Sequence, residues 1–337
     1  MRIVRNKLDW PKHLRLLVNN ECNYHCSFPG TGCEWCHKDG VNKTAGNGKR
    51  ANVEDFLFLA KVLKEKYFLE KIKIGAMEPT LFSGLNELIA GSKELGFKEV
   101  SMTSNGYFLE DKLDGLKNAG LDTVTVSMHA FNQEVYRSIT GVDGFKRVKE
   151  AAEKAIKLGF KKVKVNRVLL NFENVWGDLM SFFNWAAMNG VRIKLYKLIW
   201  SPIMDEKQYF ENYVSWESLM LYFRKYASVI EINEYLVAGR ERLLWRLKNG
   251  LEVETDTFSH KLTTEVGKVC QKCKEAPFCL EGLMSYGIEV GPSLSVGPCL
   301  LRNDLRLELW DEVRSRDKKG VAQKIGLFLA KTVGEGV

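Results

Sequence analysis

The eight cysteines of this 337-residue chain fall into two groups, with none between them. The first group is Cys22, Cys26, Cys33 and Cys36, and the second is Cys270, Cys273, Cys279 and Cys299. Cysteines that only fill a core are scattered along a chain, so this grouping indicates two sites that work through sulfur. Disulfides, zinc ions and iron–sulfur clusters are the three chemistries that such groups can serve.

Disulfides need an oxidising compartment, and nothing near the N-terminus directs the chain to one. Asp9, Lys12 and Arg15 interrupt the apolar stretch that a signal peptide requires, and no apolar run is long enough to cross a bilayer. We therefore expect a cytoplasmic protein without a membrane partner. Spacing alone leaves zinc and iron–sulfur open, because both bind Cys-x-x-Cys pairs such as Cys33–Cys36 and Cys270–Cys273.

The composition is that of a folded protein, with 45% hydrophobic residues, 27% charged residues and only seven prolines. The length suits one large domain or two of moderate size. A net charge of +8 is compatible with an anionic substrate such as a nucleotide, although many basic proteins have no such partner. No arginine-rich block or aromatic-basic stripe indicates nucleic acid.

From residue 12 to about residue 200, short aliphatic runs alternate with amphipathic stretches of helical length. The strand candidates are Leu14–Val18, Lys71–Gly75, Glu99–Thr103, Thr123–Met128, Lys162–Leu169 and Arg192–Ile199. Helices are expected between them, for example Val53–Tyr67 with Asn52 as N-cap and Gly144–Leu158 followed by Gly159. Six βα units in series predict a parallel sheet, either open or a partial barrel, with the active site at the carboxyl ends of the strands.

The C-terminal part has a different pattern. Residues 203–262 are expected to be mostly helical, including Val237–Lys248. A glycine-rich, strand-like stretch follows at Tyr286–Leu300, and a closing helix is expected near Lys318–Lys331. We therefore expect a core domain over residues 1–200 and a smaller second domain over residues 201–337.

The loop after the first strand resembles the cluster loop of the radical S-adenosylmethionine (SAM) superfamily. The family pattern is Cys-x-x-x-Cys-x-x-Cys, and Cys22 and Cys26 match its first half. An insertion delays the third cysteine, and Cys36, preceded by Trp35 and followed by a histidine, fits that place, with Cys33 as the alternative. The resemblance implies a partial (β/α)6 TIM-like barrel in which three thiolates hold a [4Fe–4S] cluster with one open iron. In the family this iron binds SAM, which is cleaved reductively to a 5′-deoxyadenosyl radical that abstracts hydrogen from a substrate.

Further segments resemble the family's SAM-binding segments in the family's order. Ile74–Pro79 is similar to its Gly-Gly-Glu-Pro segment, with Ala76-Met77 in place of the two glycines. Three segments at the ends of later strands also resemble SAM-binding segments of the family: Thr103–Gly106, Val126–His129 and Val165–Val168. Tyr136–Phe145 resembles a helix start in GTP 3′,8-cyclases of molybdopterin biosynthesis. The SAM-site residues that the resemblance implies are Gly75, Glu78, Pro79, Thr103, Asn105, Ser127 and Asn166. A zinc protein gives no account of these matches.

The second cysteine group resembles the auxiliary-cluster region of the same subgroup. The spacing of Cys270, Cys273 and Cys279 is similar to that of SPASM and twitch domains, and Cys299 follows in Gly-Pro-Cys-Leu. The resemblance implies a second, auxiliary [4Fe–4S] cluster, with a structural zinc knuckle as the alternative. Four thiolates would close the cluster for electron transfer, and three would leave an iron open for substrate.

The substrate is less constrained. The arginines that follow the auxiliary Cys-x-x-Cys in the cyclase, and its Gly-Gly tail, are both absent here, where the chain ends Val333–Val337. We therefore expect a cyclase-like paralogue that acts on an unidentified small metabolite. GTP cyclisation, a SPASM-type modification of a peptide, and a zinc-stabilised binding module without enzymatic activity are the alternatives.

Partners follow from this chemistry. A radical SAM enzyme needs SAM and a low-potential electron donor such as ferredoxin or flavodoxin. Four basic residues near the strand ends are compatible with an anionic substrate, or equally with surface ion pairs: Arg167, Lys194, Lys197 and Arg302.

Overall fold

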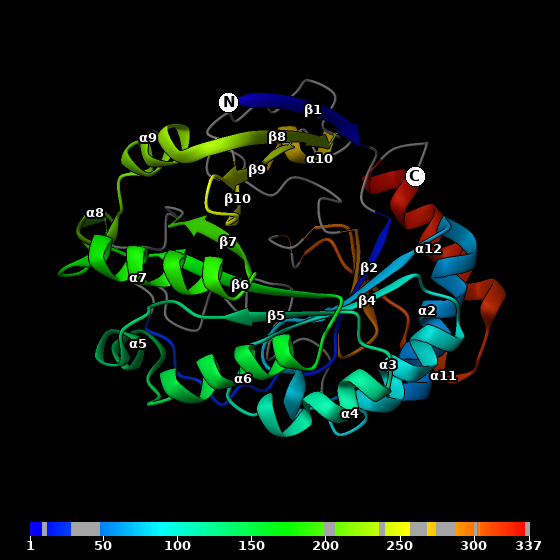
Figure 1. The fold of residues 1–337 in the computed structure, drawn as a ribbon. Coiled ribbons are helices and arrows are strands. Elements are labelled where there is room, and N and C mark those ends of the chain that lie inside the picture. The colour runs from blue at the N-terminus through cyan, green and yellow to red at the C-terminus, as the bar shows by residue number, and fades with distance from the viewer. Residues whose placement is uncertain are drawn as a thin grey trace.

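The fold is built on one long mixed sheet with a parallel centre (Figure 1). In this computed structural model, residues 1–8, 12–27, 48–198, 206–235, 240–256, 268–273, 287–299, 302 and 304–333 are described. The strand order is β1-β8-β9-β10-β7-β6-β5-β4-β3-β2-β11-β12-β13. The strands are β1 (Arg2–Leu8), β2 (His13–Leu17), β3 (Lys71–Gly75), β4 (Glu99–Ser104), β5 (Thr123–Ser127), β6 (Lys162–Leu169), β7 (Arg192–Lys197), β8 (Ala227–Tyr235), β9 (Arg240–Leu247), β10 (Glu252–Asp256), β11 (Ile288–Val290), β12 (Ser295–Gly297) and β13 (Leu307–Glu308).

The six strands β2 to β7 pair in parallel in their sequence order, which confirms the predicted αβ barrel architecture. Short turns of 3-10 helix, η1 (Pro79–Leu81) and η2 (Glu110–Lys112), follow β3 and β4. The helices are α2 (Val53–Tyr67), α3 (Leu85–Glu94), α4 (Leu113–Asn118), α5 (Gln133–Thr140), α6 (Phe145–Lys157), α7 (Val175–Met188), α8 (Glu206–Asn212), α9 (Trp216–Tyr226), α10 (Lys268–Gln271), α11 (Trp310–Arg314) and α12 (Lys318–Thr332).

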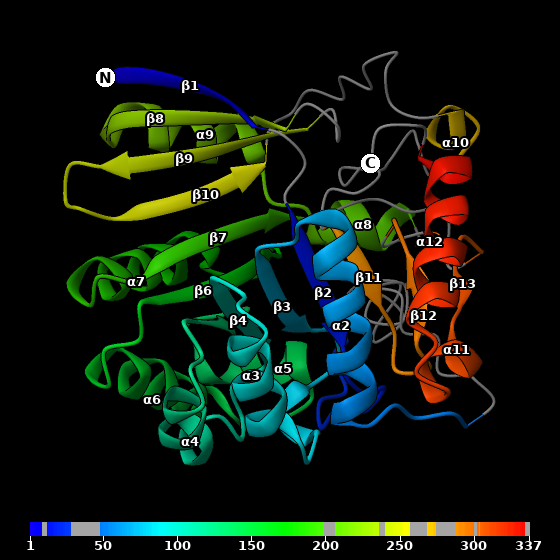
Figure 2. The same cartoon turned by 90° about the vertical axis from the view of Figure 1, so that its right-hand side faces the viewer.

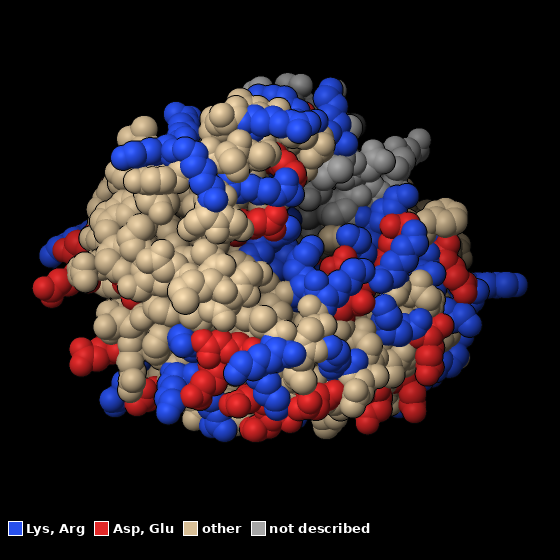
Figure 3. Space-filling view, in the orientation of Figure 1, with Lys and Arg blue, Asp and Glu red and all other residues tan. Residues whose placement is uncertain are grey.

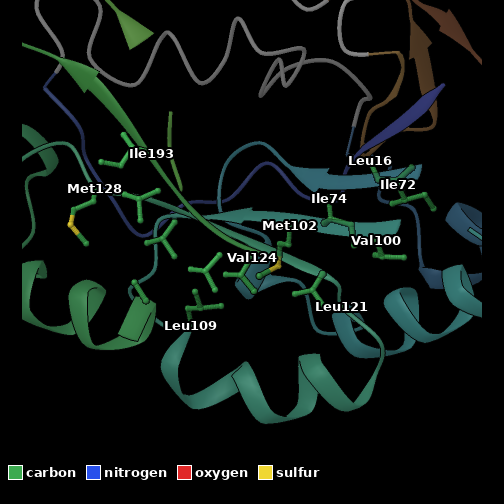
Figure 4. Packing of buried hydrophobic residues seen from close by; sticks show 14 of the residues in the cluster. Leu16, Ile72, Ile74, Val100, Met102, Leu109, Leu121, Val124, Met128 and Ile193 are labelled. Atoms are coloured by element: carbon green, nitrogen blue, oxygen red, sulfur yellow. The ribbon is translucent and has the colours of Figure 1, made fainter. Parts of the chain in front are cut away.

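The central strands alternate between an apolar face and a polar face. Side chains such as Leu16, Ile72, Val100, Val124 and Ile193 are fully buried beneath the covering helices (Figure 4). Burying these side chains between sheet and helices supplies the main apolar contribution to stability. The residues between them face the other way, so the inner face of the barrel carries the polar side chains.

Helix ends follow the predicted signals. Asn52 caps α2 in a complete capping box with Asp55, and Gly159 adopts a left-handed φ of 69° directly after α6 and its C-cap residue. Asp55 is fully buried and also receives Arg314 and Arg316, each at 2.9 Å. This ion pairing fastens α11 and α12 against α2, where both views show them side by side (Figures 1 and 2).

The C-terminal part extends the sheet at both edges of the six-strand barrel. Strand β10 pairs in parallel with β7, and β11 pairs in parallel with β2. The N-terminal strand β1 joins the β10 side by pairing with β8, so both chain ends contribute to the same sheet (Figure 2). The division of the chain at residue 200 remains a prediction.

The prediction of a helix over Val237–Lys248 is wrong, because most of this range forms strand β9. Leucine, arginine and glutamate favour helices, but pairing with β8 and β10 satisfies the β9 backbone on both sides, and Trp245 is buried there. A signal was available in Asn249-Gly250, the turn between β9 and β10, where Gly250 has φ 85°. The expectation that residues 203–262 are mostly helical is also wrong, because α8 and α9 are followed there by β8, β9 and β10, whose backbones pair in the sheet. The six predicted barrel strands, the strand-like stretch and the closing helix are confirmed within a few residues.

Candidate active site

The loop after β2 carries Cys22 and Cys26, and it is fastened to the end of α5. The His25 N–H donates to the Thr140 carbonyl at 3.1 Å, and the Ser27 N–H donates to the Ile139 carbonyl at 2.8 Å. Gly141 has φ 71°, and a Cβ there would lie 2.9 Å from the His25 carbonyl oxygen. A glycine is therefore required where α5 ends against the cysteine loop.

Two buried tyrosines add a second attachment. The hydroxyls of Tyr24 and Tyr136 lie 2.9 Å apart, and their rings meet edge to face with centroids 6.4 Å apart. Burial, together with Tyr136, raises the pKa of Tyr24, so the pair stays protonated. Sequence reasoning missed this pair, although Tyr136 lies in the segment that resembles a cyclase helix start.

The Cys22 sulfur faces hydrogen-bond donors from two elements. The Tyr24 N–H points to the Cys22 Sγ at 3.4 Å, and the Asn105 amide, from the end of β4, lies 3.7 Å from the same Sγ. Asn105 also donates to Asn23 at 2.7 Å. N–H donors of this kind stabilise a thiolate, which is the form of cysteine that binds metal. The remaining candidates of this group, Cys33 and Cys36, lie outside the described residues.

Glu78 is the most completely hydrogen-bonded side chain of the candidate site. It lies fully buried just beyond β3, and its carboxylate accepts from the Thr80 hydroxyl at 2.6 Å, the Ser104 hydroxyl at 2.8 Å and the Asn105 N–H at 2.6 Å. All these donors are neutral, and burial raises the pKa of Glu78 despite them. No ion pair joins this carboxylate to a cation of the described residues, which suits the binding of a ligand ammonium.

The segment before Glu78 is strained. Ala76 has φ 59° and Met77 has φ 50°, so both lie in the left-handed region that favours glycine. The segment is also pinned, because the Glu78 N–H donates to the Glu21 carbonyl at 2.9 Å and the Asn19 amide donates to the Glu78 carbonyl at 2.9 Å. The chain therefore keeps the backbone of a double-glycine turn without the glycines.

The remaining predicted residues lie at the ends of adjacent strands. Ser127 on β5 is in register with Asn166 on β6, and Pro79 is buried at the start of η1. Among the described residues, a Cβ added at Gly75 would contact only the Thr103 Cβ, at 4.0 Å. The buried Thr103 hydroxyl has no hydrogen-bond partner within the part of the chain that the structure describes. The glycine and the unsatisfied hydroxyl together favour a ligand position beside β3 and β4.

On the inner face of the barrel, several strands bring cationic side chains close to one another. We call Arg15 (β2), Lys73 (β3), Lys164 (β6), Lys194 (β7) and Arg242 (β9) the inner cation cluster. Burial and the other four cations of the cluster hold the pKa of Lys73 well below its usual range. On the face seen in Figure 3, Lys and Arg side chains also gather in the middle, between the regions of β10 and α2.

Two carboxylates border the inner cation cluster, and both come from the strands added at the barrel edges. Glu254 on β10 lies 2.8 Å from Lys164, and the surrounding cations lower its pKa to about 2. Glu289 on β11 lies 3.4 Å from Arg15. Among the described residues, these five cations outnumber the two carboxylates, which favours an anionic ligand here.

Of the four basic residues expected near the strand ends, Arg167 does not face the inner side. It is fully buried and pairs with Asp178 at 2.5 Å, with the Phe182 ring 5.3 Å away. Arg302 pairs with Asp304 at 2.6 Å. Lys194 belongs to the inner cation cluster and stacks over the Tyr196 ring at 4.3 Å. Both arginines therefore form ion pairs, as the alternative interpretation expected, but the Arg167 pair is buried and does not lie at the surface.

The second cysteine group is only partly described. Cys270 and Cys273 lie on and just after α10, and Cys299 is buried after β12, whereas Cys279 lies outside the described residues. Among the described residues, no group of three or more His, Cys, Asp or Glu side chains is arranged to hold a metal ion. The auxiliary cluster therefore remains a prediction.

Comparison with known proteins decides the family. A sequence profile of the Radical SAM superfamily matches residues 17–185. A probable GTP 3′,8-cyclase of Sulfolobus acidocaldarius is 31% identical over 303 residues, which cover 90% of this chain and 85% of that protein. The chain belongs to the radical SAM superfamily. Membership makes it an enzyme and implies a [4Fe–4S] cluster and SAM.

Two further relatives of this radical SAM enzyme show how far the likeness extends. A probable GTP 3′,8-cyclase of Saccharolobus islandicus is 29% identical over 313 residues, covering 93% of this chain and 90% of that protein. The crystal structure of Streptococcus suis SuiB bound to S-adenosylmethionine covers 94% of this chain and 68% of its own at 15% identity, with a TM-score of 0.60. At that identity the likeness to SuiB shows the fold alone.

The described residues fit the group that the family implies. Two thiols lie in one anchored loop, and N–H donors face the Cys22 sulfur. Asn105 links this sulfur to the Glu78 carboxylate, because its side chain faces the sulfur and its backbone N–H donates to the carboxylate.

None of the helices that the structure describes is long and apolar enough to span a membrane.

Proposed function

We propose that this radical SAM enzyme acts on a small anionic metabolite, a phosphate-bearing molecule of the nucleotide class, held at the inner face of the barrel. The observation that carries the proposal is the inner cation cluster. Among the described residues, its five cations are bordered by two carboxylates, and burial together with the other four cations holds the pKa of Lys73 well below its usual range. A phosphate group would relieve this repulsion, and burial would strengthen its attraction.

We assign the cofactor roles as follows. Cys22, Cys26 and Cys36 hold the cluster, with Cys33 as the alternative third ligand. Once bound, the cluster supplies the electron that cleaves SAM reductively, and a ferredoxin or flavodoxin in a reducing compartment replaces that electron. Glu78 and the turn from Gly75 to Pro79 receive the methionine ammonium group.

The strand ends complete the SAM site in this proposal. Thr103, Asn105, Ser127 and Asn166 form the polar border against which SAM lies, between the cysteine loop and the inner cation cluster. Their part is to orient SAM and the substrate and to exclude water from the reacting atoms. The order of these residues across β4, β5 and β6 supports the assignment.

GTP itself is the second candidate substrate. It is favoured by the relatives named probable GTP 3′,8-cyclase, which match more than nine-tenths of this chain. The residues after Cys273, Lys274 to Phe278, lack the arginines expected of that reaction. We therefore rank a cyclase-like paralogue with a different anionic substrate first.

The first test measures iron, sulfide and the visible spectrum after anaerobic reconstitution. About four irons per chain establish the SAM cluster, and about eight establish the auxiliary cluster held by Cys270, Cys273, Cys279 and Cys299. Cys36→Ala should abolish SAM cleavage, whereas Cys33→Ala should retain most of it. Zinc without colour would contradict the enzyme assignment.

The second test identifies the substrate class. Anaerobic turnover with SAM is followed by mass spectrometry of 5′-deoxyadenosine and of each candidate, with GTP, other nucleotides and unphosphorylated nucleosides compared. We expect a phosphate-dependent increase in 5′-deoxyadenosine and about a tenfold loss in affinity for Lys73→Gln. Equal turnover of nucleosides without phosphate would contradict an anionic substrate.

A further inference from the structure

Asn105 joins the two halves of the candidate site through one residue. Its backbone N–H donates to the Glu78 carboxylate at 2.6 Å, and its side-chain nitrogen lies 3.7 Å from the Cys22 sulfur. The first contact belongs to the backbone and the second to the side chain. A substitution at Asn105 therefore removes the contact with the sulfur and leaves the backbone donor of Glu78 in the chain.

The turn after β4 fixes the direction of the Asn105 amide. The Asn105 Oδ1 accepts from the Tyr107 N–H at 3.0 Å, and the amide nitrogen donates to the Asn23 Oδ1 at 2.7 Å. In a flipped amide two donors would face each other, the side-chain NH₂ group and the Tyr107 N–H. The network thus directs the nitrogen toward Cys22, and its two hydrogens allow it to serve Asn23 and the sulfur together.

The cysteine loop is packed against this turn, which keeps the amide and the sulfur together. The Tyr24 hydroxyl lies 3.5 Å from the Asn105 carbonyl, and the rings of Tyr24 and Tyr107 meet edge to face with centroids 6.1 Å apart. Asn105 is 9% exposed, so little water competes for its donors. A hydrogen bond in such surroundings is stronger than one in water.

N–H donors at a cysteine sulfur change the reduction potential of a bound iron–sulfur cluster. The reduced cluster carries one more negative charge than the oxidised cluster, so a donor directed at a thiolate stabilises the reduced form more. The Tyr24 N–H also faces the Cys22 sulfur, but it belongs to the backbone and is present in every variant. The Asn105 amide is the donor that a substitution removes.

We propose that Asn105 is a positioning residue that acts through Cys22, because its amide raises the reduction potential of the cluster. The single electron still comes from a low-potential donor such as ferredoxin or flavodoxin, and Asn105 shifts the equilibrium of that transfer toward the reduced cluster. This inference rests on the proposed assignment of Cys22 as a cluster ligand. It gives the Asn105 side chain a role toward the cluster beyond its place in the SAM site.

The experiment measures cluster reduction in the reconstituted enzyme without SAM and without turnover. Electron paramagnetic resonance during a redox titration gives the midpoint potential, and addition of SAM to a separate sample identifies the signal of the cluster at Cys22. Asn105→Leu has nearly the same shape but no donor, so the equilibrium constant for one-electron reduction should fall about tenfold, which is about 59 mV. A signal that SAM leaves unchanged belongs to another cluster and serves as the internal reference.

Asn166→Leu is the matched control. It removes an amide that is also assigned to the SAM site, but from β6, two strands away from β4. We expect it to weaken SAM binding while the reduction equilibrium stays within about twofold of the native value. In Asn105→Leu, SAM affinity measured by calorimetry should change less than about threefold, because Glu78 keeps its backbone donor. Loss of SAM affinity with a native potential would overturn the proposal.

A second variant covers the case in which Asn105→Leu fails to fold or to take up iron. Asn105→Ser retains a hydroxyl that accepts from the Tyr107 N–H, but this side chain is too short to reach the Cys22 sulfur. It should lower the potential to the same extent at the iron content of the native enzyme. A lower iron content with a native potential in the remaining cluster would make Asn105 a purely structural residue, contrary to the proposal.

A cysteine variant separates this inference from the proposed function. If Cys22→Ala loses the SAM-sensitive signal while both Asn105 variants keep the native potential, the role of Asn105 alone is overturned. If Cys22→Ala retains the iron and the SAM-sensitive signal, Cys22 is not a ligand, and the proposed cluster assignment fails together with this inference.

Discussion

Glu78 is a fully buried carboxylate and Glu254 a partly buried one, and their environments shift their pKa values in opposite directions. Glu78 is surrounded by hydroxyl and N–H donors, and burial raises its pKa. Glu254 lies beside Lys164 and Arg192, and cations lower its pKa to about 2. The first site is ordered by neutral hydrogen bonds, and the second by charge.

The difference indicates what each region is for. A carboxylate held only by neutral donors keeps its charge uncompensated, so a ligand ammonium gains from meeting it. A carboxylate between cations has its charge matched within the protein and contributes to stability. In the proposed function, the Glu78 region therefore receives a cationic group, and the inner cation cluster beside Glu254 receives an anionic one.

The largest expected effect comes from Glu254→Gln. The substitution leaves Lys164 and Arg192 facing an uncharged amide, so we expect the free energy of unfolding to fall by about 3 kcal/mol at pH 7. Denaturant unfolding measures the change. Glu150→Gln, which removes an exposed pair with Lys146 at 3.9 Å, should cost less than about 1 kcal/mol and serves as control. Equal losses in the two variants would contradict a structural role for Glu254.

The same carboxylate predicts an acid dependence. The pKa of Glu254 in the folded state, about 2, is below its ordinary value of 4.5, so its contribution is present above pH 4.5 and is lost as the pH falls toward 2. The stability difference between the native enzyme and Glu254→Gln should therefore shrink over this range. A constant difference in unfolding experiments from pH 7 to pH 3 would refute the assignment.

Glu78→Gln should have the next largest effect, on SAM affinity. Replacing the carboxylate by an amide of the same shape removes the negative charge that, in our proposal, binds the methionine ammonium group. SAM binding should therefore weaken at least about tenfold. Calorimetry on the reconstituted enzyme measures it, with the exposed Glu87→Gln as control. Unchanged affinity would remove Glu78 from the SAM site.

A pH series sharpens this test. Because burial raises the pKa of Glu78, protonation should begin to weaken SAM binding at a pH above the ordinary range of a glutamate. Glu78→Gln should lack this acid limb. The same limb in both proteins would assign it to another group.

The smallest effect is expected at the strained turn beside Glu78. Ala76→Gly relieves a left-handed φ of 59°, so the free energy of unfolding should rise by about 0.5–1 kcal/mol. Ala90→Gly, inside helix α3, makes the same chemical change at an ordinary helical position and should lower it by about 1 kcal/mol. A fall for Ala76→Gly would show that the turn carries no strain.

Much of the barrel could be predicted from the sequence because its signals are local. Alternating aliphatic runs, the Asn52 cap and the glycine after α6 each act within a few residues, and the predicted strands β2 to β7 match the structure closely. Strand β9 could not be predicted this way, because its leucines and arginines favour a helix and only β8 and β10 make it a strand.

The cysteine loop and the ordered segments after it, from Glu78-Pro79 to Val165–Val168, predicted the radical SAM family from the sequence alone, and the family comparison confirms it. Only the tertiary structure decided which charges meet. Arg15 and Glu289 are 274 residues apart, and Lys164 and Glu254 are 90 apart, yet each pair is within ion-pair distance. Strand order and register create such pairs, and no local pattern encodes them.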